Sequence, residues 1–361
     1  MSARTPLNLP LSVSSTATWR SRALAILLMA VISSIFWVDS RYPALMKRYH
    51  AGAQVKASGE LTFGVVYQVD RSMPLGARAW RTTVNWLDAN RIGMTFSFLF
   101  GPAALAFLAM LPRRRTNSRY LNTLLGAAAG TPMAVCTNCI APIARGLYAS
   151  GMSRESVLAA MFASPALNVV VLAMTFSLFP AKVALLKLVT VLILIFVFAP
   201  LAATRGKESV AGYTCPIEIE VAETWPQAIV SVARSYARSF WYVFRVAFPL
   251  MLLGAALGAM VIEVLPAQAL LGQATLLGIV SVALVSAFLP VPMALDVAIA
   301  YIAMMHGAPM PYVVAILCTL GILSVYSALV VGKTISWRVA GAAYATVTAL
   351  GIVAGLVARE F

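Results

Sequence analysis

Long apolar runs separated by short polar segments make up most of the chain. A membrane-spanning helix needs about 20 mostly apolar residues. Seven uninterrupted runs approach or exceed that length: 23–38, 92–111, 155–179, 183–203, 246–264, 311–331 and 336–358. No small-residue cleavage site follows the first run, so we expect it to be an uncleaved membrane anchor. The pattern predicts an all-α, polytopic membrane protein with about seven full spans.

Two further apolar stretches, 120–150 and 268–306, are interrupted by helix breakers. The interruptions are Thr131, Pro132 and Pro142 in the first stretch and Pro290 and Pro292 in the second. Proline removes a backbone donor, and a freed backbone group in hydrocarbon costs several kcal/mol unless another group satisfies it. We therefore expect two broken or re-entrant hairpins, whose exposed helix ends line a cavity. Kinks that serve only packing are the alternative.

The two broken stretches open two similar halves of the chain. Gly151 and Gly307 each start the run that follows a broken stretch, and each half reads span, broken hairpin, span, span. With a cytosolic N-terminus the halves enter the membrane from opposite sides. This predicts an inverted repeat, the arrangement in which secondary transporters place their substrate site at broken helices near the midplane.

The same pattern divides the chain into five parts. We expect 1–38 to be a cytosolic tail and membrane anchor, 39–91 an external polar loop or cap, 92–203 the first permease half, 204–245 a cytosolic linker with an amphipathic helix, and 246–361 the second permease half.

Composition and charge support a membrane protein and its orientation. Hydrophobic residues make up 61% of the chain and charged residues only 11%, against about 25% charged residues in soluble domains. This composition excludes a soluble enzyme and a disordered chain, and four cysteines form no disulfide scaffold. Of the 27 Lys and Arg residues behind the net charge of +15, 16 fall on the inner side. The exceptions outside are Lys182, Lys187, Arg359 and eight residues of 39–91. We expect a multi-pass protein of the bacterial inner membrane with a cytoplasmic N-terminus.

The first break carries Cys136, Asn138 and Cys139. Thiolates are soft ligands for thiophilic species, and a Cys-x-x-Cys pair can also exchange disulfides. A structural zinc site needs four ligands, and the sequence offers no second pair. The pair therefore indicates contact with a soft solute or metal species. Two small residues packed in a tight turn are the alternative.

Two other polar positions lie within apolar runs. Ser164, Pro165 and Asn168 interrupt the run 155–179, and a buried Asn in a span either bonds across helices or meets substrate. Asp296 lies four residues after Pro292, and no Lys or Arg between 246 and 332 can pair with it. We therefore expect an unpaired carboxyl that couples protons or, alternatively, faces water at the end of a half-helix.

The residues of the first half resemble a known family. The run from Val135 through Cys136, Cys139 and Pro142, then Gly146 and Gly151, then Ser164-Pro165 and Asn168, resembles the YraQ/ArsP-type predicted permeases. The family usually has Cys-x-Cys where this chain has Cys-x-x-Cys. The resemblance covers residues 92–358 and implies a two-half membrane permease, and ArsP-type members export trivalent organoarsenicals.

These observations predict a secondary transporter, an exporter of a small soft solute such as a metalloid, an organoarsenical or a metal species. The expected substrate contacts are Cys136, Asn138, Cys139, Thr131, Pro132, Pro142, Ser164, Pro165, Asn168, Pro290 and Pro292, with Asp296 for proton coupling and the two cysteines as metal ligands. No nucleotide-binding motif is present, and we expect no enzyme activity and no cofactor. The expected partners are the solute and the bilayer but no nucleic acid, and the sequence is compatible with a homo-oligomer. A transmembrane thiol–disulfide relay and a non-transporting subunit of a membrane complex are the alternatives.

Overall fold

The structure is a computed structural model that describes residues 19–43, 46, 66–70, 72–110, 118–204, 224–264 and 273–360. Within these ranges the regular secondary structure is helical, apart from one isolated bridge between Leu320 and Leu323. The all-α prediction is therefore confirmed. Cys215 lies outside the described residues, as does most of the segment 44–65 that the sequence assigns to an external loop.

The chain begins with α1 (Trp19–Phe36) and a short π-helical turn, η1 (Trp37–Arg41). The first half then comprises α4 (Leu75–Ala109), α5 (Arg119–Gly130), η2 (Thr131–Met133), α6 (Thr137–Ala149), α7 (Arg154–Ala166), α8 (Val169–Leu178), α9 (Ala181–Ile193), η3 (Leu194–Phe198) and α10 (Ala199–Thr204). The second half comprises α11 (Trp225–Val264), α12 (Leu276–Phe288), α13 (Leu295–Met305), α14 (Met310–Thr319), α15 (Val325–Thr334), α16 (Trp337–Val357) and η5 (Ala358–Glu360).

The two halves share the order of their helices and the backbone of their turns. A left-handed alanine precedes α6 and another precedes α13, with φ of 46° at Ala134 and 64° at Ala294. This conformation costs a non-glycine residue about 1–2 kcal/mol, so its recurrence before corresponding helices marks two equivalent breaks. Gly151 and Gly307 adopt φ of 92° and 84° in the turns that follow these helices.

Each half contains a second break that the sequence pattern did not predict. The run 155–179 is divided into α7 and α8, which are bent by 47°, and the run 311–331 is divided into α14 and α15. Asn168 caps the N-terminus of α8 by accepting from Val171 N–H, and Ser324 caps α15 by accepting from Ser327 N–H. A capping side chain replaces the backbone partners that a continuous helix would supply. Both runs are apolar on average despite a few polar residues, so their hydropathy matches that of uninterrupted spans.

Two other predicted boundaries fall inside continuous helices. The amphipathic segment 226–245 and the span 246–264 form one continuous helix, α11. The change in hydrophobic pattern along it therefore reflects a change of surroundings rather than a break. Residues 75–91, expected in a loop or cap, are the first part of α4.

Among the described residues, four helices are long and apolar enough to cross a membrane: Trp19–Arg41, Ala181–Ala203, Trp225–Val261 and Trp337–Glu360. The bent pair α7 and α8 would make a fifth. This pattern supports a multi-pass membrane protein.

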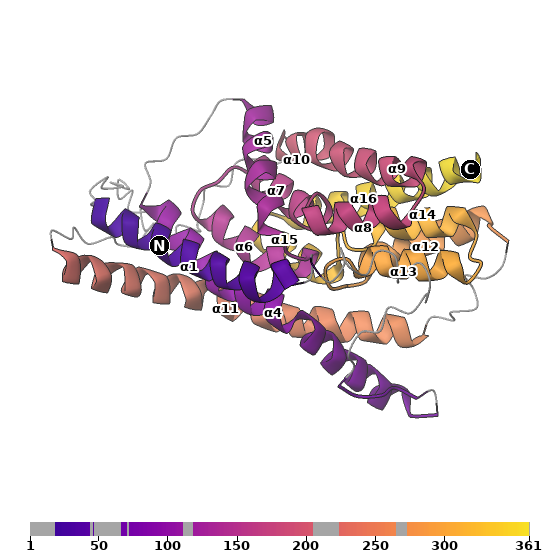
Figure 1. The fold of residues 1–361 in the computed structure, drawn as a ribbon, viewed down its shortest axis with the longest axis horizontal. Coiled ribbons are helices and arrows are strands. Elements are labelled where there is room, and N and C mark those ends of the chain that lie inside the picture. Colours follow the sequence, from indigo (N-terminus) through magenta and orange to yellow (C-terminus); the bar gives the residue numbers. More distant parts are fainter. Residues whose placement is uncertain are drawn as a thin grey trace, which may run out of the picture.

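The halves pack by exchanging helices. The long helices α4 and α11 lie against each other along one side of the molecule (Figure 1). Helix α6 of the first half packs on α15 of the second, and α13 of the second half packs on α8 of the first. These contacts between the halves bring breaks of both halves to one buried region.

Candidate functional site

Asn138 joins the breaks of the two halves. Its side chain is fully buried in the first turn of α6. The amide Nδ2 donates to the carbonyl of Val291 at 3.1 Å, and Oδ1 accepts from Ser324 Oγ at 2.7 Å. The neighbouring Thr137 hydroxyl donates to the carbonyl of Gly321. Three breaks thus meet at the N-terminus of α6. Backbone groups freed in an apolar region need such partners.

Cys136 and Cys139 lie at this junction and are joined by a disulfide. Cys136 is the N-cap of α6, and its Sγ accepts from the backbone N–H of Cys139 at 3.1 Å. The two residues are only 3% and 1% exposed. A Cβ at Gly93 of α4 would come within 2.7 Å of Cys139 Sγ, so α4 covers that sulfur. A cysteine at a helix N-terminus has a stabilised thiolate once it is reduced.

Helix α4 supplies two site residues that the sequence analysis placed in an external cap. Asn90 is buried, and its Oδ1 lies 3.6 Å from Cys136 Sγ. Trp86 is also buried, and its indole N–H donates to the carbonyl of Pro290 at 2.6 Å. Trp86 and Asn90 are four residues apart and share one face of the helix. That spacing was visible in the sequence, but the polar residues around it favoured a loop.

Arg41 reaches the same region from η1. Its Nε donates to the carbonyl of the left-handed Ala134 at 2.7 Å, and its guanidinium lies over the Phe36 ring, 4.4 Å from the centroid. Arg41 therefore holds the first break from outside the two halves. Its position among the charges of 39–91 gave no signal of this contact.

Ser164 and Asn168 lie beside the first break but bond differently. The Ser164 hydroxyl lies 3.2 Å from Val135 N and 3.4 Å from Val135 O. The Asn168 amide donates to the carbonyls of Ser164 and Pro165 within its own chain turn, and its oxygen caps α8. Asn168 thus has local partners for both ends of its side chain.

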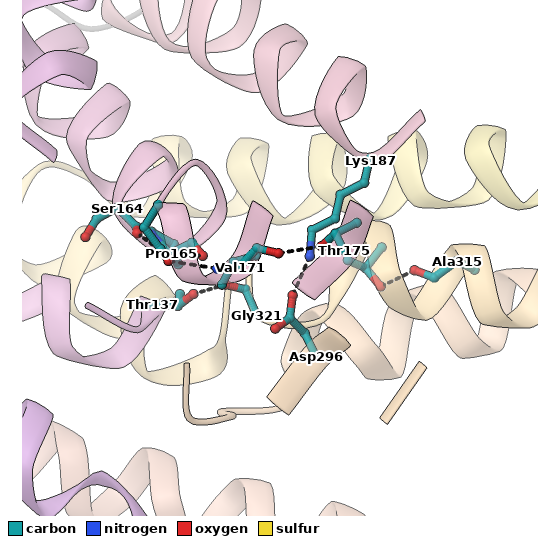
Figure 2. A network of polar contacts seen from close by, with 11 residues as sticks. Thr137, Ser164, Pro165, Val171, Thr175, Lys187, Asp296, Ala315 and Gly321 are labelled. Atoms are coloured by element: carbon teal, nitrogen blue, oxygen red, sulfur yellow. Dashed lines mark hydrogen bonds and ion pairs between the residues drawn. The ribbon is translucent and has the colours of Figure 1, made fainter. Parts of the chain in front are cut away.

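Asp296 has a partner, contrary to the sequence analysis. Lys187 Nζ of α9 lies 2.6 Å from Asp296 Oδ2, and both side chains are buried. Figure 2 shows the two side chains meeting beside the Gly321 break. The sequence argument failed because it searched for a partner only within the second half, and it placed Lys187 outside the membrane. The exchange of helices between halves brings the ammonium to the carboxylate.

The proline residues of the breaks are distributed over different surroundings. Pro132 is exposed and Thr131 half-buried, and the Thr131 hydroxyl bonds to Ala127 of its own helix. Pro142 is buried in α6, where the backbone around it closely approaches Gly101 of α4. Pro165 and Pro290 are buried and Pro292 half-buried. Of these prolines, Pro290 offers its carbonyl to Trp86, and the next residue, Val291, offers its carbonyl to Asn138.

Within the described part of the chain, no three His, Cys, Asp or Glu residues form a metal-binding group. Cys318 is a buried free cysteine in α14, and His306 is exposed with Nδ1 2.9 Å from the carbonyl of Ile302. The cysteine pair by itself offers two soft sulfur ligands when reduced.

The sequence matches known proteins over most of its length. The model of the family ArsP_1, described as a predicted permease, matches residues 92–360. The UPF0718 protein YraQ of Escherichia coli (strain K12) is 26% identical over 252 residues, which cover 70% of this chain and 71% of that protein. No solved structure matches the chain. The matched residues include every helix of both halves except the first part of α4, and the chain belongs to the ArsP-type family of predicted membrane permeases.

Proposed function

We propose that this permease exports a small, soft, thiophilic solute. The observation that carries the proposal is the position of Cys136 and Cys139, where a first-half helix begins and the second-half breaks end. A transporter must bind its solute where its two moving halves meet, and this pair is the softest ligand set among the described residues.

The cysteines act in their reduced form. The backbone N–H of Cys139 donates to Cys136 Sγ and holds that sulfur at the start of α6. When methylarsenite binds, each new As–S bond replaces one As–OH bond and one S–H bond, and the hydroxide leaves with the thiol proton as water. Asn138 holds the opposing breaks in register around the bound solute. Ser164, Asn168 and the break prolines shape the surrounding backbone.

The exchanged helices support an inverted repeat. The corresponding breaks before α6 and α13, and the reciprocal packing of α6 on α15 and α13 on α8, fit two halves of opposite orientation. We place the N-terminus in the cytoplasm and the protein in a bacterial inner membrane, on the distribution of Lys and Arg. Asp296, at membrane depth, is the proposed proton-coupling residue.

Transport in everted membrane vesicles tests the assignment. Methylarsenite, cadmium and arsenite serve as soft probes, and everted vesicles that contain the wild type should accumulate at least one of them when a proton gradient is imposed. Cys136→Ser with Cys139→Ser should abolish that accumulation. Cys318→Ala removes the other buried thiol of the described residues and should leave accumulation in place. Equal accumulation by the Cys136→Ser/Cys139→Ser variant and the wild type would remove the cysteines from the site.

The disulfide itself favours one second function, a transmembrane thiol–disulfide relay. Such a relay takes up two electrons and two protons as the pair is reduced and returns them to an acceptor disulfide. The sulfurs must then become accessible to a partner thiol, whereas both cysteines are buried in this state. Mass-tag alkylation in cells distinguishes the two functions, because only a relay requires the pair to alternate between oxidised and reduced forms during turnover.

A further inference from the structure

We propose that Lys187 is the internal counter-cation of a proton site at Asp296, and that protonation of Asp296 releases Lys187 and opens the contact between α9 and α13. The inference rests on the proposed permease function, and it assigns a role to a residue outside the cysteine site. The ion pair is the closed state.

The bonding of the pair suits a contact that breaks. Within the described residues, the 2.6 Å bond between Lys187 Nζ and Asp296 Oδ2 is the only hydrogen bond recorded for either side chain. A buried ion pair repays its desolvation only when further hydrogen bonds satisfy the remaining lone pairs and protons. Separation of the two side chains therefore breaks one direct hydrogen bond between α9 and α13.

Among the titratable side chains of the described elements around the ion pair, Asp296 is the proposed proton acceptor. The elements packed against α9 and α13 include α7, α8, α14, α16 and η3. Helix α8 and η3 have no charged residue. The titratable residues of the other three are Arg154 and Glu155 at the start of α7, Tyr312 and Cys318 in α14, and Arg338 and Tyr344 in α16.

Three of these side chains bond to groups other than the ion pair. Glu155 bonds to Asn122, Tyr312 bonds to the carbonyl of Gln273, and Tyr344 bonds to the carbonyl of Leu284. Cys318 is the one that interacts with Lys187, and a thiol is a poor proton acceptor beside a carboxylate.

The pair is connected to the cysteine junction through the Gly321 break. Gly321 has φ of 78°, and a Cβ placed there would lie 3.0 Å from Asp296 Cγ. The carbonyl of the same residue accepts from Thr137, next to Cys136 (Figure 2). Movement of the Asp296 carboxyl therefore acts directly on the segment that bonds to the start of α6.

An aromatic contact also links α13 to the turn that leads into α9. Phe179 and Tyr301 are buried, with ring centroids 6.1 Å apart in an edge-on arrangement. Phe179 is the C-cap of α8, two residues before α9 begins, and Tyr301 lies in α13. Movement of α13 away from this turn and from α9 would open both contacts together.

The step balances in charge and protons. One proton adds to the Asp296 carboxylate, and the ammonium of Lys187 keeps its charge. A lone buried ammonium is costly, so its four-carbon stem must extend toward water. Lys187 is in the second turn of α9, six residues after Ala181, and extension toward the start of that helix displaces the Phe179–Tyr301 contact. Deprotonation of Asp296 restores the pair.

Spin-label distances in the full-length protein test the inference without any solute. The spin labels are attached to cysteines that replace Leu185 of α9 and Met305 of α13, both at exposed positions. The labelled protein also carries Cys215→Ser. Acidification should shift the wild-type distance distribution to longer values. The neutral variant Lys187→Gln/Asp296→Asn should show one distribution at every pH, whereas Lys182→Gln, an exposed lysine of the same helix, should respond as the wild type. The double variant is the primary one because a single substitution leaves a buried charge unpaired.

Transport of methylarsenite in proteoliposomes is a second test of the ion-pair proposal. Exchange by the wild type should depend on pH, and a pH gradient should drive accumulation. The double variant should lose the pH dependence and accumulate to no more than the external concentration. An unchanged pH response of the double variant in both arms, or a wild-type distance distribution that ignores pH, overturns the inference. A wild type that responds to pH but exchanges none of the soft probes refutes the proposed solute and leaves the ion-pair inference standing.

Discussion

The breaks before α6 and before α13 have similar backbones and opposite chemistry. Both contain a left-handed alanine, Ala134 or Ala294, and both are followed by a short helix and a glycine turn. The first break continues into neutral and soft side chains, Cys136 and Asn138, whereas the second continues into the charged Asp296. One scaffold thus presents a soft site in one half and an ionic site in the other.

The difference lies in the helix that follows each break. The break before α13 takes part in neutral hydrogen bonds, because Asn138 donates to the Val291 carbonyl and Trp86 donates to the Pro290 carbonyl. Asp296, in the first turn of α13, adds an ion pair with Lys187 of α9. In the proposed transporter, the break before α6 contacts the solute, and Asp296 after the second break takes up the proton.

Breaking the ionic contact should have the largest effect on stability. Asp296→Ala leaves the buried Lys187 ammonium unpaired, and we expect a loss of about 3–5 kcal/mol in the free energy of unfolding. The neutral Lys187→Met/Asp296→Leu variant should lie within about 1 kcal/mol of the wild type, since it buries no charge. Unfolding in detergent measures both, and equal destabilisation by the single and double variants would contradict the ion-pair account.

Removal of the neutral hydrogen bonds of Asn138 should lower the free energy of unfolding by less than removal of Asp296. Asn138→Ala leaves the Val291 carbonyl and the Ser324 hydroxyl without their amide partner in a buried region. We expect a loss of about 1–3 kcal/mol, with weaker binding of soft probes. Asn85→Ala, at a half-buried amide that bonds to residues 66 and 67 near the surface, is the matched control outside the junction and should leave binding of soft probes unchanged. A change at Asn138 no larger than that at Asn85 would remove Asn138 from the junction.

Gly321 joins the two sites and allows a test of their connection. Gly321→Ala introduces a Cβ at φ of 78° and 3.0 Å from Asp296, which should destabilise by about 1–2 kcal/mol. It should also shift the pH dependence of transport, because the added methyl presses on the carboxyl. Gly341→Ala adds a methyl with nothing within 4 Å in α16, and should be neutral or slightly stabilising. If the pH profile of Gly321→Ala is identical to that of the wild type, the contact between Gly321 and Asp296 does not affect the proposed proton site.

The smallest effect concerns the link from α4. Trp86→Phe keeps a buried aromatic ring but removes the donor to the Pro290 carbonyl. We expect a loss of about 0.5–1.5 kcal/mol, the net value of one hydrogen bond. Trp80→Phe, at an exposed tryptophan of the same helix, serves as the control in the same unfolding measurement, and equal stability of the two variants would remove the proposed bond.

Several features of the site could be predicted from the sequence because they are local. Prolines within apolar stretches marked two of the four breaks, and the spacing of Cys136 and Cys139 marked a soft pair. The breaks at Asn168 and Ser324 were missed because apolar residues flank them on both sides, so hydropathy shows no interruption. Trp86 and Asn90 were missed because the polar residues between Asp70 and Arg91 favoured a loop over the start of a helix.

The sequence by itself determined that the chain is helical and enters a membrane, since apolar runs, prolines and glycines act through their immediate neighbours. Only the tertiary structure decided which side chains meet. Lys187 and Asp296 are 109 residues apart, and they meet because α9 of the first half and α13 of the second both pack against α14. No periodicity along one chain encodes such contacts. They follow from the need of every buried charge and every freed backbone group to find a partner away from water.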